Sequence, residues 1–228
     1  METIKNNLEI INKKIKKSAL KVNRNPEEIK LVAVTKTATI EQIKEAINAG
    51  VKIIGENKVQ EAKEKYQILT ADTEWHLVGH LQTNKVKYAI EIFDCIQTVD
   101  SIKLAKEIDK RSLQFGKTTN VLVEVNVSGE ESKYGIKPEE VEPFLKEISE
   151  FYRIRVRGLM TIAPIEEDKE KVRPYFRKLR ELSKEIKSKN IKNVKMDYLS
   201  MGMTDDFEVA IEEGANMVRI GRGIFGFH

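Results

Sequence analysis

The segment LVAVTK, residues 31–36, is a short run of apolar and β-branched residues, and residues 40–49 follow it with a helical pattern of apolar positions. The same alternation continues along the chain, with further strand-like runs at 51–55, 75–79, 95–99, 120–127, 154–162, 194–201 and 216–221. Strands that alternate with helices form parallel sheets joined by crossover helices. Eight such units within 228 residues predict the α/β class and a (β/α)8 TIM barrel.

An extra helix is expected ahead of the first strand. Within residues 1–22, apolar side chains recur every three or four positions among Lys, Glu and Asn. This spacing predicts an amphipathic helix that packs outside the barrel through Ile4, Leu8, Ile11 and Ile15. No linker or composition shift interrupts the chain, so we expect a single domain over 1–228. The competing architecture is an open doubly wound sheet, but no G-x-G-x-x-G follows the first strand.

Composition and charge argue against several classes of function. Lys and Arg number 40 against 36 Asp and Glu, and both signs are interspersed, so we expect a mixed solvated surface and no nucleic-acid partner. Cys95 is the only cysteine and is expected to pack as a buried hydrophobe, and the three histidines are too scattered for a metal site. The chain shows neither a signal peptide nor an apolar run of about 20 residues, so we expect a cytoplasmic protein without a membrane partner.

Lys36 is the strongest candidate for chemistry. In a TIM barrel the working residues lie at the carboxyl ends of the strands. If the first strand extends to its last residue, Val32, Val34 and Lys36 share one face, and Lys36 lies at the top of the apolar interior. Desolvation favours the neutral amine of a lysine, which can attack an aldehyde to form a Schiff base. The alternative is a lysine that extends past the strand end into solvent.

Two glycine-containing turns follow the last two strands. The first is SMGMTDD at 200–206, in which Thr204 or Asp205 is expected to cap the next helix, and the second is GRG at 221–223. The loops after strands seven and eight often bind phosphate in barrels of this kind, because backbone N–H groups at such turns attract an anion. Together the two turns therefore indicate an anion site, although glycine by itself often only closes a turn.

Arg219 lies inside the last strand, in the segment MVRIG. An arginine is always charged, so within a barrel it must meet an acceptor. Either a bound ligand or a carboxylate such as Glu124 would supply one.

Seven segments of the chain together resemble the pyridoxal phosphate homeostasis protein family. They are LVAVTKT (31–37), GENKVQEAKEK (55–65), WHLVGHLQTNK (75–85), NVSGEESKYGI (126–136), RGLMTI (157–162), LSMGMTDDFEVAI (199–211) and VRIGRGIFG (218–226). The resemblance covers essentially the whole chain in the same order. It implies the barrel of fold-type III pyridoxal 5′-phosphate (PLP) proteins, related to the N-terminal domain of alanine racemase.

The resemblance also implies a set of cofactor-binding residues. It implies that Lys36 carries PLP as an internal aldimine and that Arg219 faces the pyridine nitrogen. It further implies that Ser200, together with the backbone near Gly221 and Arg222, holds the phosphate.

Further pocket residues implied in the same way are Asn57, His80 and Met201. One position departs from the family pattern, because many members have a small residue where Arg222 stands. If only the backbone binds phosphate there, the change is harmless or adds positive charge; if a side-chain hydroxyl is needed, Arg222 must replace it.

For function, the resemblance implies a carrier or buffer of PLP in intracellular cofactor homeostasis, without an established catalytic reaction. PLP-dependent apo-enzymes are the expected recipients, and a monomer is expected. The chain ends soon after the eighth strand, so we expect no room for the second domain that supplies the opposing base in alanine racemase. Two alternatives stay open: an amino-acid racemase that uses Tyr134 as its second base, and a partner-binding module for which PLP is a signal.

Overall fold

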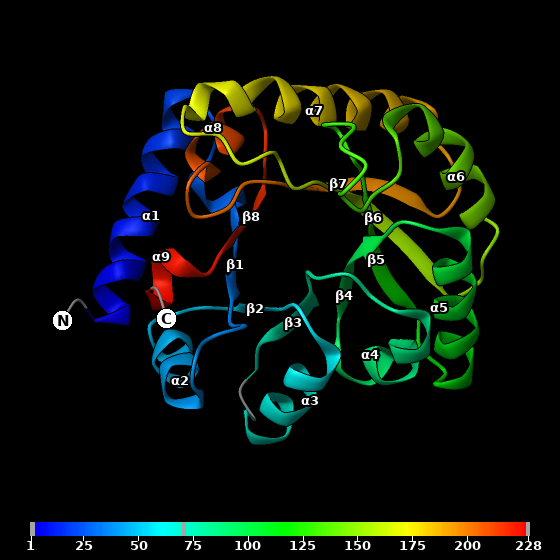
Figure 1. The fold of residues 1–228 in the computed structure, drawn as a ribbon, viewed down its shortest axis with the longest axis horizontal. Helices are drawn as coiled ribbons and strands as arrows, with labels where there is room; N and C mark the ends of the chain where they lie inside the picture. Colours follow the sequence, from blue (N-terminus) through cyan, green and yellow to red (C-terminus); the bar gives the residue numbers. More distant parts are fainter. Residues whose placement is uncertain (1–2, 70–71, 227–228) are drawn as a thin grey trace.

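Parallel strands close into a barrel in the computed structural model, which describes residues 3–69 and 72–226 (Figure 1). Each strand pairs with the next in sequence, and β8 pairs with β1 to complete the ring. The strands are β1 (Lys30–Val34), β2 (Ile53–Glu56), β3 (Glu74–Leu77), β4 (Cys95–Val99), β5 (Thr119–Glu124), β6 (Ile154–Met160), β7 (Val194–Ser200) and β8 (Met217–Ile220). The predicted TIM barrel is therefore confirmed.

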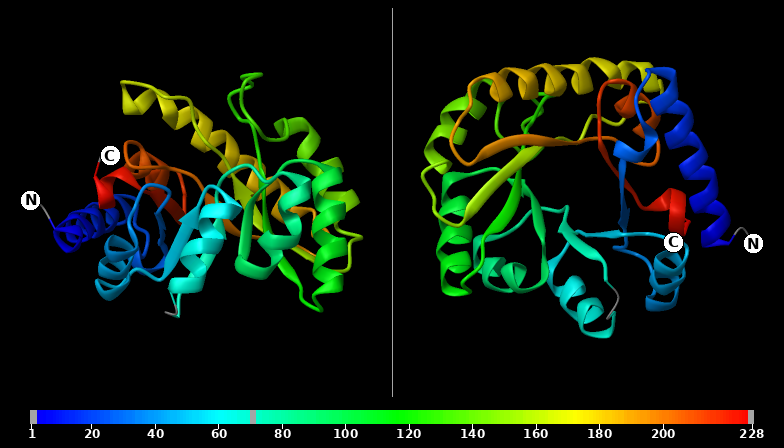
Figure 2. Two further views of the ribbon diagram at one scale, coloured as in Figure 1. Left: turned by 60° about the horizontal axis from the view of Figure 1, so that its bottom comes forward. Right: turned by 180° about the vertical axis from the view of Figure 1, so that it is seen from behind.

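Helices form a ring outside the strands, as Figures 1 and 2 show from three directions. The α-helices are α1 (Ile4–Lys21), α2 (Ile40–Asn48), α3 (Val59–Ile68), α4 (Val86–Ile92), α5 (Ile102–Gln114), α6 (Val141–Ile148), α7 (Arg173–Ser188), α8 (Phe207–Glu212) and α9 (Arg222–Phe225). Short 3₁₀ turns precede β1, α4, α6 and α7, namely η1 (Pro26–Glu28), η2 (Thr83–Lys85), η3 (Pro138–Glu140) and η4 (Lys169–Val172). In the left view of Figure 2, the β5–α6 loop and the start of α7 project beyond the barrel on the same side.

Two local predictions are wrong in ways that bear on the site. The first strand ends at Val34 rather than at Lys36, because the chain enters a turn there. The GRG segment is not a simple turn, since Arg222 opens the single-turn helix α9. Both differences lie at the carboxyl ends of strands, where tertiary packing sets the chain direction.

The N-terminal helix α1 packs on the barrel as expected. The Thr3 side chain accepts a hydrogen bond from the backbone N–H of Asn6 and so caps the helix. The four isoleucine and leucine positions named from the sequence are all buried, and the helix contacts α8 and α9. This contact supports the segment that follows β8.

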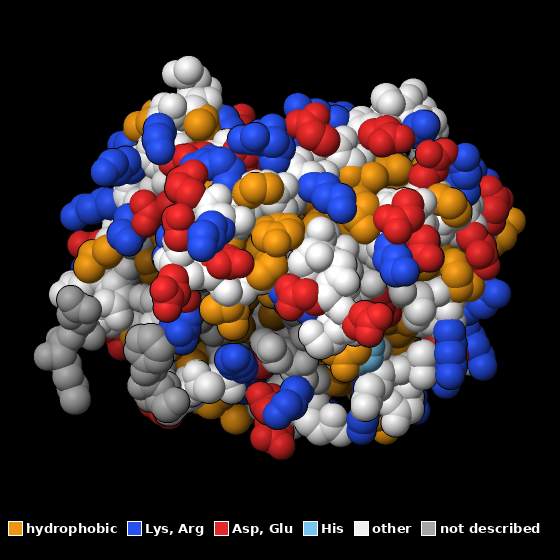
Figure 3. Space-filling view, turned by 45° about the horizontal axis from the view of Figure 1, so that its top comes forward, with side chains coloured by type: hydrophobic (Ala, Val, Ile, Leu, Met, Phe, Trp, Pro, Cys, Tyr) orange, Lys and Arg blue, Asp and Glu red, His pale blue; other side chains and the backbone are white. Residues whose placement is uncertain are grey.

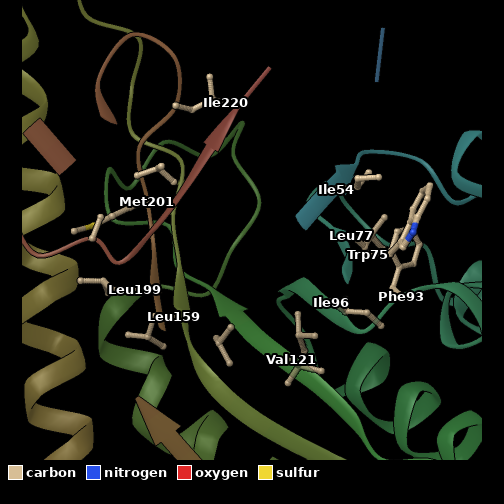
Figure 4. Close-up of a cluster of buried hydrophobic side chains, with 14 of the residues drawn as sticks. Ile54, Trp75, Leu77, Phe93, Ile96, Val121, Leu159, Leu199, Met201 and Ile220 are labelled. Carbon is tan, nitrogen blue, oxygen red and sulfur yellow. The ribbon is translucent and has the colours of Figure 1, made fainter. Parts of the chain in front are cut away.

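Two apolar layers account for most of the core. Inside the barrel, one cluster contains Val32, Ile53, Val78, Cys95, Leu122, Met160 and Met217, with Val34 and Tyr198 packed against it. A larger cluster lies between strands and helices, and Figure 4 shows part of it, including Trp75, Phe93, Leu159 and Leu199. Burial of Cys95 is as expected. The alternation of side chains along each strand therefore separates an inner face from an outer face.

The surface carries both charge signs. In Figure 3, Lys and Arg side chains are interspersed with Asp and Glu over the face shown, without one continuous positive patch. None of the helices in the described ranges has the length and apolarity needed to cross a bilayer. Within the same ranges, no group of three or more His, Cys, Asp or Glu side chains is arranged to hold a metal ion.

Gly158 gives a test of the barrel geometry. Its φ is +155°, and a Cβ atom there would overlap the Tyr198 carbonyl of the neighbouring strand β7. Gly158→Ala should therefore lower the free energy of unfolding by about 3 kcal/mol or more, because overpacking adds to backbone strain. Gly116 also has a positive φ, +66°, but has open space around it, so Gly116→Ala should cost only about 1 kcal/mol. Urea unfolding measures both, and equal losses would contradict this account of β6–β7 pairing.

Candidate functional site

Lys36 lies at the corner of a β-turn at the carboxyl end of β1. The turn is closed by a hydrogen bond of 3.0 Å from the Ala38 N–H to the Thr35 carbonyl. The Lys36 side chain is exposed and makes no hydrogen bond or ion pair within the part of the chain that the structure describes. The expectation that it continues the apolar inner face is wrong, because the strand ends two residues earlier. The lysine is instead presented to solvent from a short turn.

A buried ion pair supports this turn from below. The Lys65 ammonium on α3 donates to the Thr35 carbonyl and to Glu56 Oε1, each at 2.6 Å. The Thr35 hydroxyl donates to the same carboxylate oxygen at 2.5 Å. Glu56 and Thr35 are fully buried, so these contacts lie where water does not compete with them. The peptide that precedes Lys36 is therefore held in one place while the lysine side chain remains free.

Arg219 lies inside the barrel close to the same rim. It is 4% exposed, and it donates to Ser200 Oγ at 2.8 Å and to the Thr161 carbonyl at 2.9 Å. Burial lowers the pKa of the guanidinium to about 10, while the charges of Glu124 and Asp206 act in the opposite direction. Arg219 thus stays charged at neutral pH. Two of its five N–H donors are engaged within the described residues, which leaves donors for a ligand.

The loops after β7 and β8 are tied to each other. The Gly223 N–H donates to Thr204 Oγ1 at 3.3 Å, and the Arg222 guanidinium pairs with the Asp205 carboxylate. Thr204 and Asp205 therefore do not cap α8 as expected, since they reach across to the neighbouring loop. Gly202 has a φ of +92°, and a Cβ there would press on α8, so the first turn needs glycine.

The turn at Gly221 also abuts β1. A Cβ added to Gly221 would lie 3.1 Å from the carbonyl oxygen of Val34. Because β8 pairs with β1, the Gly221–Arg222 segment and the Lys36 turn are adjacent at the rim. The structure thus brings the Lys36 turn and the glycine turn, which are far apart in the sequence, to the same part of the rim.

Three carboxyl groups near this rim are held in unfavourable surroundings. Burial, together with the nearby Asp100, raises the pKa of Glu124 to about 7 against the opposing effect of Arg219. Burial also raises the pKa values of Asp100 and Asp206 above the ordinary range. Glu124 does not accept a hydrogen bond from Arg219, so the expected direct pair is replaced by a longer-range interaction. The site thus contains a buried cation and carboxyl groups whose ionisation is disfavoured. Such surroundings favour a ligand with many hydrogen-bond acceptors.

Of the remaining predicted residues, Asn57 and His80 have side chains available near the rim, whereas the side chain of Met201 points away from it. Asn57 is partly buried, and its Oδ1 has no hydrogen-bond partner among the described residues. His80 stacks on Tyr134, with ring centroids 4.0 Å apart, and lies 3.6 Å from Asp100. These side chains are available near the rim.

The structure does not place the side chain of Met201 in the pocket, where the resemblance to the family led us to expect it. Its side chain is fully buried in the cluster between strands and helices, beside Leu199, as Figure 4 shows. Strand alternation places Ser200 inside the barrel, so the next side chain must point outward. Only the backbone of Met201 can contribute to a site within the rim.

Sequence reasoning missed several polar residues that the structure joins to this site. They are Gln97, which accepts a hydrogen bond from Ser200 at 2.6 Å, Thr161 and Lys65. Gln97 is fully buried in the middle of an apolar strand, and a polar residue at such a position is the signal that could have revealed it. Lys65 gave no such signal, because lysines are frequent along α3.

The chain is similar to known proteins along almost its whole length. The family model described as alanine racemase, N-terminal domain, matches residues 2–228. The pyridoxal phosphate homeostasis protein of Aquifex aeolicus is 47% identical over 214 residues, which cover 93% of each chain. The chain belongs to the pyridoxal phosphate homeostasis protein family.

Solved structures agree with this membership. PipY of Synechococcus elongatus, solved with PLP bound, has a TM-score of 0.82 and 32% identity, and the match covers 93% of this chain and all of that one. An alanine racemase of Clostridium difficile has a TM-score of 0.77 at 19% identity, and the match covers 97% of this chain and 57% of the racemase. The second likeness concerns the fold alone. The resemblance in the seven sequence segments is therefore confirmed at the level of the pyridoxal phosphate homeostasis protein family.

The raised pKa of Glu124 predicts a pH-dependent effect of Glu124→Gln. The folded protein holds this proton up to about pH 7 and the unfolded chain only to about 4.5, so the contribution of Glu124 to wild-type stability falls as the pH rises between these values. The glutamine variant lacks that loss. It should match the wild type near pH 4.5 and be more stable at pH 8, by at most about 3 kcal/mol for 2.5 pKa units.

Thermal unfolding at the two pH values measures the difference. The same substitution at exposed Glu139 controls for the loss of one negative charge. An equal change in melting temperature at both pH values would contradict the assignment of Glu124 as a buried, reluctant acid.

Proposed function

We infer that this protein binds PLP at the rim formed by β1, β7 and β8 and acts in PLP homeostasis by holding and releasing the cofactor. The observation that carries the inference is that the Gly221 turn abuts the end of β1, next to the turn that holds Lys36, while Arg219 is buried on the neighbouring strand β8. The pyridoxal phosphate homeostasis proteins and the PLP-bound PipY structure support the choice of ligand.

The residues present fit the groups of PLP. The cofactor supplies an aldehyde to which an amine can bond reversibly, on an aromatic ring that also bears a phosphate. Lys36 offers a free amine, and the linked loops around Thr204 and Gly223 offer a hydroxyl and backbone N–H groups. Arg219 retains donors for the ring nitrogen, and the buried Oδ1 of Asn57 lacks a partner that a ligand could provide.

The other residues of the site orient these groups. Lys65 and Glu56 hold the backbone that precedes Lys36, so that the side chain of Lys36 extends from a fixed position. Ser200 and the Thr161 carbonyl hold the guanidinium of Arg219 in one plane. Because an arginine can only donate, Arg219 would hold a ring nitrogen of PLP in its unprotonated form and would so weaken the electron withdrawal that the bound cofactor supplies.

Exposure of Lys36 favours a carrier over a closed catalytic site. An amine that solvent can reach is also open to other amines that compete for the cofactor. That arrangement suits delivery of PLP to PLP-dependent apo-enzymes, which we include in the proposal. We also propose that the protein is a monomer and that it is cytoplasmic. Arg222, held by Asp205, adds positive charge beside the proposed phosphate site but is already paired with a carboxylate. We therefore assign phosphate contact there to the backbone.

Lys36→Ala should abolish covalent capture of PLP. The proteins are incubated with PLP, reduced with borohydride and examined by mass spectrometry of their peptides. The cofactor should be found on Lys36 in the wild type, and no lysine of the variant should be labelled to the same extent. The urea midpoint should stay unchanged, because substitution of an exposed side chain costs within about 0.5 kcal/mol. Lys58→Ala is the control, since Lys58 lies in the adjacent β2–α3 loop with a 72% exposed side chain. Labelling of Lys58 or Lys133 with Lys36 unmodified would overturn the assignment.

The PLP-loaded protein should not turn over amino acids at the rate of an enzyme. The racemase hypothesis requires a second base, for which Tyr134 is the candidate, and its ring is stacked on His80. Incubation with L-alanine or L-serine and chiral chromatography should show less than about one turnover per second. In parallel, an apo-enzyme should recover activity from the loaded protein. If the wild type turns over amino acids at or above that rate and the Tyr134→Phe variant does not, the carrier hypothesis is wrong and the racemase hypothesis holds.

A further inference from the structure

A line of buried hydrogen bonds crosses the barrel interior from Arg219 to the opposite end. Arg219 Nη1 donates to Ser200 Oγ at 2.8 Å, and Ser200 Oγ donates to Gln97 Oε1 at 2.6 Å. Gln97 Nε2 contacts His76 Nδ1 at 2.8 Å, and His76 Nε2 lies 3.4 Å from Glu74 Oε2. These residues come from strands β8, β7, β4 and β3, and the four from Arg219 to His76 are at most 4% exposed.

The ends of this line set the direction of its hydrogen bonds. An arginine can only donate and an ionised carboxylate can only accept, whereas a hydroxyl, an amide and an imidazole do both. Contact with His76 lowers the pKa of Glu74, so this carboxylate is ionised at neutral pH. Every intervening group must then donate toward Glu74, and His76 must accept at Nδ1 and carry its proton on Nε2.

This direction limits what Ser200 can offer a ligand. Its single proton is committed to Gln97 Oε1, and one lone pair is committed to Arg219. A phosphate dianion has only acceptor oxygens, so it needs a donor rather than the remaining lone pair. In the arrangement observed, Ser200 therefore cannot donate to a phosphate.

We propose that Gln97 and His76 are positioning residues that decide whether Ser200 presents a proton or a lone pair to the phosphate of the ligand. The inference rests on the proposed function, and it takes the phosphate to lie within reach of Ser200, as the resemblance to the family implies. Rotation of the Gln97 amide by half a turn directs Nε2 to Ser200 and Oε1 to His76. Ser200 then accepts from Gln97 and Arg219, and its own proton is free to point to the phosphate.

The rotated arrangement requires a proton on His76 Nδ1. A neutral histidine with its proton there would turn the lone pair of Nε2 toward the Glu74 carboxylate, which is repulsive. The doubly protonated ring avoids this, because it donates to Gln97 on one side and faces the carboxylate on the other. Phosphate binding at one end of the barrel and protonation of His76 at the other therefore favour each other, and the coupling is reciprocal.

The charged groups around His76 are compatible with this coupling. Glu74 on the same strand is the nearest, with a side chain 54% exposed at the barrel opening. Cys95, paired with His76 on β4, stays neutral, because burial raises the pKa of its thiol to about 12. The other charged groups that act on Glu74 or Cys95 at this end are Lys30 on β1, Asp94 before β4 and Arg157 on β6. Met217 of β8 supplies only a sulfur contact to Gln97, at 3.2 Å.

The experiment follows His76 directly by NMR on protein labelled with ¹⁵N-histidine, which contains three histidines. Signals are assigned by substitution, and the ¹⁵N shifts report the charged fraction of His76 near pH 7. PLP, and separately inorganic phosphate against chloride at equal ionic strength, should raise that fraction, whereas pyridoxal without phosphate should not. The affinity for PLP relative to pyridoxal should fall on the order of fivefold or more between mildly acidic and mildly alkaline solution, because alkali removes the proton that the rotated arrangement requires on His76 Nδ1.

Two variants separate this coupling from ordinary packing. Gln97→Leu interrupts the line, and His76→Gln keeps a donor and an acceptor but cannot titrate. Both should bind PLP at Lys36 yet lose the pH dependence of the PLP-to-pyridoxal ratio, and Gln97→Leu should leave the ¹⁵N shifts of His76 insensitive to phosphate. Circular dichroism identifies a variant that fails to fold, in which case the other variant decides.

The outcomes distinguish the two levels of inference. If PLP binds, as judged by its absorbance, and the signals of His76 stay unchanged with both PLP and phosphate, the coupling is wrong and the cofactor site stands. If PLP does not bind but inorganic phosphate charges His76, the coupling stands without the proposed function. If neither ligand alters His76, the coupling is overturned whatever the fate of the cofactor.

Discussion

A permanently charged guanidinium enclosed by the barrel is the constraint on which the rest of this site depends. Arg219 is buried on β8, and removal of such a charge from water is costly unless acceptors surround it. Ser200 and the Thr161 carbonyl supply two of them, from β7 and from the segment after β6. Glu124 and Asp206 favour the charged form of Arg219 at longer range to the extent that they are ionised. The need to satisfy one side chain thus explains polar residues on several strands that would otherwise belong to an apolar interior.

The same need extends down the barrel axis. Once Ser200 has accepted from Arg219, its proton must go to a further acceptor, which is Gln97, and Gln97 in turn requires His76. Each hydrogen bond of the line gives a partner to a buried polar group. Leaving such a group without a partner costs more free energy than an ordinary hydrogen bond contributes. A polar line of this kind stiffens the interior, and it also connects the ligand rim with the opposite opening. Stability and communication between the two ends have the same physical origin.

Lys36, which we propose as the residue that bonds PLP, has the opposite surroundings. Its backbone is fixed from below by the Lys65–Glu56 pair, while its side chain is left in solvent. A residue that must both form and give up a covalent link benefits from a rigid base and a reachable amine. An enzyme that had to protect a reactive intermediate from water would favour a closed site. The exposure of Lys36 therefore agrees with the proposed carrier function.

The sequence by itself determined the barrel, the outer helix and the family. Strand–helix alternation and the apolar spacing within residues 1–22 depend on local periodicity, which survives without knowledge of any contact. It also named Lys36, Ser200, Arg219 and Gly221 as candidates, because strand ends in such a barrel converge on one rim.

The tertiary structure alone decided how those residues are used. It ended β1 before Lys36, directed Met201 outward, and moved Thr204 and Asp205 from an expected helix cap to the loop after β8. It also revealed the hydrogen-bond line through Gln97 and His76, whose members lie on strands far apart in the chain. Periodicity assigns a residue to an inner or outer face, but hydrogen-bond partners depend on strand register and on closure of the barrel, which no local pattern specifies.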